Sequence, residues 1–197
     1  EDTYYPMDGK IEVTVSIPSG KKVKMPMRFR IPSWANGASV DVCGASVKAV
    51  AGEVAVIERV WSDGDRVVLD FPMELRADTW YENAISVERG PLVYALKIKE
   101  EWEKVQLDPK EGKGDYYWQV TSGSPWNYAF MFKASIEPQK HFTVNVDHDK
   151  LKGNWYWSQE DAPIVITAKA TKIKDWTLYN GDTGPMPFSI KRSRIYN

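Results

Sequence analysis

The sequence predicts an all-β chain built as two consecutive antiparallel β-sandwich domains of the jelly-roll kind. Apolar and polar side chains alternate along most of its apolar segments, which is the period of a strand with one buried face. Turn residues separate these segments roughly every 8–12 residues, a spacing typical of sandwiches and barrels. No segment of useful length shows the 3.6-residue period of an amphipathic helix.

The first predicted strand carries an apolar face made of Ile11, Val13, Val15 and Ile17. Residues 23–31 repeat the alternation, and Pro26 on their polar side predicts an edge strand or a bulge, because proline cannot donate to a sheet ladder. Further strands are expected at residues 39–42, 47–50, 54–61, 66–71, 84–88, 92–98, 116–120, 128–132, 142–146 and 164–170. Gly90, between two of these strands, is expected to adopt a conformation that other residues avoid.

A charged, turn-rich stretch near the middle of the chain is the best candidate for a domain boundary. It begins at Lys99-Glu100-Glu101 and contains Pro109, Gly112 and Gly114. We therefore expect a first sandwich over residues 1–98, a linker over 99–115, and a second sandwich over 116–197. The end of the second is expected to be loop-like.

Composition excludes several classes of function. The 197 residues are 43% hydrophobic and 27% charged, and 26 Lys and Arg face 27 Asp and Glu. This balance is typical of a soluble globular protein and argues against nucleic-acid binding, which needs a basic face. No apolar run is long enough to cross a membrane. The chain opens with Glu1-Asp2-Thr3 rather than Met, so we expect it to be a piece of a longer polypeptide.

Several strings together resemble one enzyme family. They are Tyr5-Pro6, Asp8-Gly9-Lys10, residues 28–35 (RFRIPSWA), Arg59-Val60-Trp61, Gly64-Asp65, Phe71-Pro72-Met73 with Arg76, residues 88–94 (ERGPLVY) and residues 124–128 (SPWNY). The chain resembles the C-terminal β-sandwich region of glycoside hydrolase family 127, the bacterial β-L-arabinofuranosidase-like family. The resemblance touches most of the chain and is strongest up to Leu96.

The resemblance implies that catalysis takes place outside this chain. Family enzymes are thought to place a cysteine nucleophile with further cysteines and a glutamate around zinc in an upstream α/α-barrel. A zinc site needs about four ligands, whereas Cys43 is the single cysteine here, and it occupies a turn before Gly44. No catalytic residue and no metal ligand is therefore assigned, and any zinc is expected in the absent catalytic domain. The resemblance also implies a periplasmic or secreted bacterial enzyme.

Two functions follow for the chain itself. The first is a non-catalytic segment that packs against the upstream catalytic domain and stabilises it. The alternative is a carbohydrate-binding module for arabinose-containing plant glycans. Candidate sugar-binding residues are Trp126 and Asn127, an indole beside an amide, and Trp155 and Trp157, which share one face of an expected strand. Packing inside the protein is the competing interpretation of the same aromatic residues.

The remaining polar candidates are expected to have structural roles. Carboxylates able to form a glycosidase pair are present, but sequence alone cannot place two of them face to face. Capping of turns is the expected role of Asp63, Asp65, Glu82, Glu88 and Asp161. Asp147-His148-Asp149 is expected to form a solvated turn rather than a metal site. Arg89 is expected to bind a carboxylate such as Glu74 or Glu88.

Overall fold

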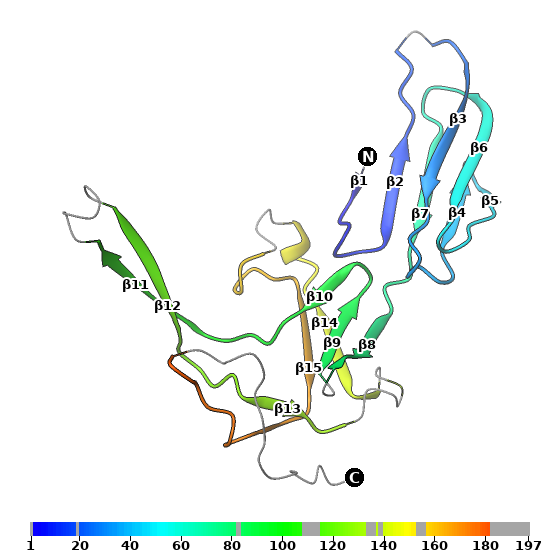
Figure 1. Cartoon of the computed structure of the whole chain (residues 1–197). Helices are drawn as coiled ribbons and strands as arrows, with labels where there is room; N and C mark the ends of the chain where they lie inside the picture. The colour runs from blue at the N-terminus through cyan, green and yellow to red at the C-terminus, as the bar shows by residue number, and fades with distance from the viewer. Residues whose placement is uncertain are drawn as a thin grey trace. The chain divides into compact units, whose positions relative to one another are not determined.

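The computed structural model of the chain confirms the all-β prediction (Figure 1). A short 3-10 turn, η3, spans Lys150–Lys152. No helix among the described residues is long and apolar enough to span a membrane. The structure describes residues 2–18, 20–81, 84–107, 115–132, 137, 140–152 and 157–181.

The contacts divide the chain into two compact units. The first contains Glu1–Tyr94 and Glu137–Ile166, and the second contains Ala95–Ile136 and Thr167–Asn197. Residues 137–166 thus group with the first unit, although the sequence placed them in a second sandwich. Proline and glycine mark chain turns, but only tertiary contacts decide which unit a later strand joins. The expected bounds of the first sandwich (1–98), the linker (99–115) and the second sandwich (116–197) stay a prediction.

A five-stranded antiparallel sheet forms one layer of the first unit. Its order is β1-β2-β7-β4-β5, and its bounds are β1 Asp2–Thr3, β2 Lys10–Thr14, β4 Ser39–Val42, β5 Ala45–Val47 and β7 Arg66–Asp70. The central strand β7 pairs with β2 on one side and β4 on the other, so that Leu69 lies between Ile11 and Val40. Strands distant in sequence are therefore adjacent in the sheet.

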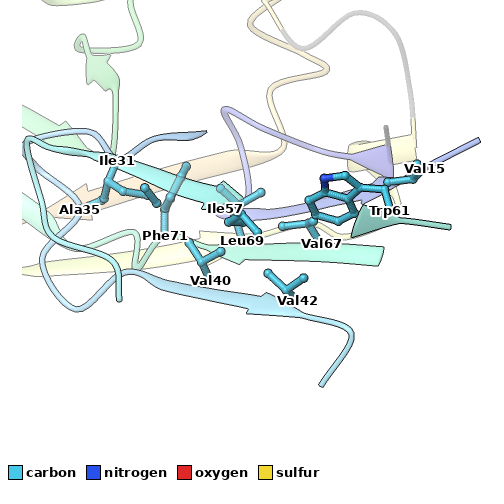
Figure 2. Close-up of a cluster of buried hydrophobic side chains, with 11 residues drawn as sticks. Val15, Ile31, Ala35, Val40, Val42, Ile57, Trp61, Val67, Leu69 and Phe71 are labelled. Carbon is cyan, nitrogen blue, oxygen red and sulfur yellow. The ribbon is translucent and has the colours of Figure 1, made fainter. Parts of the chain in front are cut away.

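A two-stranded ribbon, β3 (Val23–Arg30) with β6 (Val54–Trp61), forms the second layer of the same core. Trp61 is completely buried, and its indole Nε1 donates to the Met25 carbonyl at 3.0 Å. Because one buried cluster draws side chains from both sheets, this part of the chain is arranged as a sandwich (Figure 2). The cluster consists of Val15, Ile31, Ala35, Val40, Val42, Ala55, Ile57, Trp61, Val67, Leu69 and Phe71. The expected edge position of the strand with Pro26 is confirmed within this ribbon.

A second, smaller core completes the first unit. One three-stranded sheet has the order β10-β9-β8, with β8 Leu75–Thr79, β9 Ile85–Arg89 and β10 Leu92–Tyr94, and a separate pair joins β14 (Phe142–Val146) to β15 (Ile164–Ala168). Gly90, at the turn between β9 and β10, has φ 57°, as expected for a glycine there. The buried members of this core are Met7, Leu151 and Ile164.

The described part of the second unit consists of paired strands. β11 (Glu100–Gln106) pairs with β12 (Tyr116–Ser122), and β13 (Tyr128–Phe130) pairs with β16 (Ala170–Lys172). The structure places β11 within residues 99–115, where the sequence predicts a linker. The charged residues that suggested a linker are the exposed side chains of this strand. A second full sandwich stays a prediction.

Candidate functional site

The β11–β12 ribbon carries the most prominent aromatic surface of the described chain. Seven consecutive pairs hold the two strands in register, from Glu100 opposite Ser122 to Gln106 opposite Tyr116. Because directly opposite residues of an antiparallel pair share a face, three rings lie on one side of the ribbon. We call the following set the aromatic face: Glu100, Trp102, Lys104, Gln106, Tyr116, Trp118 and Val120.

The rings of the aromatic face contact one another edge-on. Trp118 lies 6.2 Å from Trp102 at an interplanar angle of 74° and 6.1 Å from Tyr116 at 88°, measured between centroids. Edge-to-face pairs of this kind are favourable because the positive edge of one ring meets the negative face of another. The three rings therefore form a packed cluster and not a flat, coplanar platform for a sugar.

Polar groups on the same ribbon fix the cluster. The Nζ atom of Lys104 lies 3.7 Å from the Tyr116 ring centroid, a cation–π contact. The indole Nε1 of Trp102 donates to Glu100 Oε2 at 2.9 Å. Gln106 Nε2 donates to the Asp115 carbonyl at 2.7 Å. The rings are thus held in place while about half of each side chain stays exposed.

Both faces of the ribbon lie open within the described structure. The side-chain exposures of Trp102, Tyr116 and Trp118 are 59%, 49% and 51%, and Tyr117 on the opposite face is 48% exposed. Isolated two-stranded ribbons are marginally stable in water, and clustered exposed aromatic residues mark contact surfaces. The exposed rings of the aromatic face are therefore suited to contact with another protein surface.

Sequence reasoning did not single out these aromatic residues. The available signal was the presence of aromatic residues on both sides of the turn-rich stretch, with Trp102 before it and Tyr116 and Trp118 after it. It was obscured because a strand exposed on both faces carries charges at successive positions.

The sequence-predicted sugar-binding residues are only partly described. Trp126 and Asn127 are half-buried in the second unit, and Trp157 in the first is 75% exposed. The Asn127 amide donates to the carbonyls of Ile173 and Trp176, at 2.9 and 3.1 Å, and so ties two loop segments together. Trp155 lies outside the described residues. A sugar-binding role for these four residues stays a prediction.

The described carboxylate candidates act in turns and ion pairs. Asp63 Oδ1 accepts from the Ile17 amide at 2.7 Å, and Asp65 Oδ2 accepts from the Ser62 amide at 2.9 Å. The Ser62 bond, with the Arg59 charge, holds the pKa of Asp65 below its ordinary value against the opposing effect of burial. Asp161 Oδ2 accepts from Ser158 Oγ at 2.8 Å. Glu82 lies outside the described residues.

Glu88 pairs with a different arginine from the one expected. Arg76 binds Glu88 and, at 3.2 Å, Asp78, whereas Arg89 donates to the Met7 carbonyl at 3.2 Å. The expectation that Arg89 binds Glu74 or Glu88 is therefore wrong. Alternation explains the difference, because Arg76 lies directly opposite Glu88 in the β8–β9 pair.

Metal-binding candidates take structural roles in the described part of the chain. Cys43 is exposed in a left-handed turn with φ 53°, and Gly44 donates to Asp41 Oδ1 at 2.8 Å. Asp147 Oδ1 accepts from the amides of Asp149 and Lys150. No group of three or more potential metal ligands occurs among the residues that the structure describes.

A family model matches the first part of the chain. Residues 1–73 match the model described as "Beta-L-arabinofuranosidase, GH127 middle domain". This range contains the sandwich of β1 to β7, and the family-like strings at 88–94 and 124–128 lie beyond it. The matched model is described as a middle domain, whereas the sequence resemblance pointed to the C-terminal region of the family. No curated protein matches the chain.

Two solved structures are similar to larger parts of the chain. A chain described as "Glycoside hydrolase" has 26% identity and a TM-score of 0.43, over 61% of this chain and 23% of that one. Ara127N-Se, a GH127 β-L-arabinofuranosidase from Geobacillus stearothermophilus T6, has 22% identity and a TM-score of 0.43, over 86% and 26%. The match thus spans about a quarter of the length of each solved chain.

Proposed function

From the premise that residues 1–73 belong to glycoside hydrolase family 127 as its middle domain, we propose that this chain is a non-catalytic accessory segment of a glycoside hydrolase. In this role it packs against the catalytic domain of the same polypeptide and stabilises it. The parent enzyme acts on arabinofuranosides, as the family description suggests.

The observation that carries the proposal is the exposure of the aromatic face. Trp102, Tyr116 and Trp118 are held in one arrangement by edge-on contacts, yet about half of each side chain is open to solvent. Burying apolar surface stabilises by about 25 cal/mol per Å², and large aromatic rings contribute most of this at interfaces. A catalytic domain that covers this face would bury the exposed rings, and this burial would stabilise both the contact and the two-stranded ribbon.

The chemistry of the described polar groups supports a non-catalytic role. Asp63, Asp65 and Asp161 use their oxygens to hold turns, and Glu88 is paired with Arg76. Glycosidases that work with two carboxylates place them on either side of one bond, one as acid and the other as base or nucleophile. These four carboxylates are employed in local structure instead.

The test is binding between this chain and the separately produced catalytic segment of the parent protein, followed by calorimetry. Trp118→Ala removes the ring that contacts both neighbours, and we expect it to weaken binding at least tenfold, or about 1.4 kcal/mol. Trp157→Ala is the matched control, because it deletes an exposed indole from the other unit. Equal binding by wild type and Trp118→Ala would remove the aromatic face from the interface.

A second candidate function is binding of arabinose-containing glycans, favoured by the exposure of Trp157. An open indole can stack on the apolar face of a sugar ring. Titration with arabino-oligosaccharides should then quench tryptophan fluorescence, and Trp157→Ala should abolish the quenching. Absence of quenching at millimolar ligand would exclude glycan binding and leave the accessory role as the single proposed function.

A further inference from the structure

The outer face of the β3–β6 ribbon is a second exposed surface, in the first unit. Pairing in this ribbon sends Met27, Phe29, Ala55 and Ile57 toward the sandwich core, so the alternate positions point away from it. All of these outward positions are exposed. We call the following set the cationic face: Lys24, Pro26, Arg28 and Arg30 from β3, and Val54, Val56, Glu58 and Val60 from β6.

Three cations of this face form a row without partners. No carboxylate among the described residues lies within ion-pair distance of Lys24, Arg28 or Arg30. Glu58 is the single carboxylate on the face and lies opposite Pro26.

Several strand cations elsewhere in the first unit contrast with this row. Lys10 and Arg66 both bind Glu12, and Arg59 binds Asp65 at 3.3 Å. Strand pairing brings carboxylates to these cations, yet no described carboxylate forms an ion pair with the row on β3. The cations of this face are therefore free to form ion pairs with carboxylates outside the described structure.

A row of valines lies directly beside the cations. Val54 is opposite Arg30, Val56 is opposite Arg28, and both valines are 51% exposed. Val60, opposite Lys24, is 46% exposed. Sugar sites rely on aromatic rings, whereas protein interfaces combine an apolar centre with charged groups at the rim. Aliphatic and cationic rows side by side thus fit a protein surface better than a glycan.

We propose that the cationic face docks onto an acidic surface of the remainder of the parent polypeptide, a proposal that rests on the accessory role given above. The partner surface presents carboxylates opposite Lys24, Arg28 and Arg30 and aliphatic side chains opposite the valines. Planar guanidinium groups bind carboxylates through two parallel hydrogen bonds, which gives such a contact orientation as well as attraction.

The experiment measures binding of this chain to the separately produced catalytic segment at low and high salt. The test variant combines Lys24→Gln, Arg28→Gln and Arg30→Gln. The control combines Lys48→Gln, Lys169→Gln and Lys172→Gln, which removes the same charge from exposed positions elsewhere. Circular dichroism checks that both variants fold. We expect the test variant to bind about tenfold more weakly, the control to bind as wild type, and only the test variant to lose salt dependence.

The outcomes distinguish a failure of this inference alone from a failure of the accessory role. Tight binding that neither salt nor the test variant alters would overturn the inference and leave the accessory role standing. Failure of wild type to bind would overturn both.

A parallel titration with sodium polygalacturonate tests whether the carboxylates that bind this face belong to an anionic polysaccharide instead of a protein. If it binds wild type and not the test variant, while the catalytic segment binds both equally, the face belongs to an anionic polysaccharide and the proposal fails. The salt dependence of wild type provides a readout that needs no variant.

Discussion

Trp61 and Met25 join the two strands of the β3–β6 ribbon through a side chain as well as through the backbone. The indole Nε1 of the completely buried Trp61 donates to the Met25 carbonyl at 3.0 Å, and the Arg59 guanidinium lies 5.0 Å from the Trp61 ring centroid. The largest side chain of the core thus has both its apolar body and its polar N–H satisfied.

Replacing Trp61 by Phe should destabilise the first unit. The substitution leaves the Met25 carbonyl without its donor, at a cost of about 1–3 kcal/mol, and the smaller ring adds a packing loss. Urea unfolding measures the change. Trp80→Phe is the control, because Trp80 is 63% exposed and donates to Ser86 Oγ at 2.9 Å, so its loss should cost less than about 0.5 kcal/mol. Equal costs at the two positions would contradict the role given to Trp61.

Replacing Gly9 by Ala should also destabilise the sandwich. A Cβ atom at Gly9 would lie 1.9 Å from the Phe71 carbonyl oxygen, and the Phe71 amide donates to the Gly9 carbonyl at 3.1 Å. The overlap is with backbone just after β7, so relief requires movement of the sheet, and we expect a loss of about 3 kcal/mol. Gly44→Ala is the control. Gly44 has φ 87° and no atom within 4 Å of an added Cβ, so only the left-handed backbone strain remains, at a cost of about 1–2 kcal/mol. A smaller loss of unfolding free energy for Gly9→Ala than for Gly44→Ala would contradict the predicted overlap with the Phe71 backbone.

Acid should weaken the pairing of β2 with β7 through Glu12. The Lys10 side chain, 2.8 Å away, lowers the pKa of Glu12 from its ordinary value of 4.5, and Arg66 adds to this effect while burial opposes it. Because the folded pKa is lower than the unfolded one, the stabilisation is present above pH 4.5 and is lost as pH falls through the folded pKa. Thermal melts from about pH 6 to about pH 3 should therefore show a steeper decline for wild type than for Glu12→Gln. Parallel declines would exclude Glu12 as a contributor.

The isolated chain should not hydrolyse aryl arabinofuranosides. Its single thiol, Cys43, lies in an exposed turn, and no further cysteine exists in the sequence to share a metal with it. Cys43→Ser should fold normally, since the Cys43 side chain contributes only a weak contact to the Arg66 carbonyl at 3.5 Å. A chromogenic assay of both proteins checks the prediction. Turnover by wild type that disappears in Cys43→Ser would make the chain an enzyme.

Local pattern predicted the strands well where one face is buried. Residues 39–42, 54–61 and 142–146 were predicted with the bounds that the structure has, because a buried face enforces strict alternation. β1, β8 and β16 were not predicted, and β11 was interpreted as a linker. In β11, six of seven side chains are exposed, so its sequence carries no apolar alternation.

The candidate site was less predictable than the fold. The sequence analysis chose Trp126, Trp155 and Trp157 as candidate contact groups, whereas the rings that form a cluster come from strands separated by a turn-rich stretch. Trp102 contacts Trp118 only because the ribbon register makes them diagonal neighbours. Pairing of β2 with β7 likewise depends on tertiary contacts that no local pattern encodes. The family-like strings supplied part of the information that local pattern lacks, since residues 1–73 match a model of the family that these strings indicated.

The most direct test of the accessory role is the melting temperature of the catalytic segment as this chain is added. A partner that binds only the folded state stabilises it by RT ln(1 + [L]/Kd), or about 2.7 kcal/mol at a concentration 100 times the Kd. We predict that the melting temperature rises steadily with the concentration of this chain and that Trp118→Ala shifts the rise to higher concentration. A melting temperature that stays constant up to high micromolar concentrations of this chain would contradict the account.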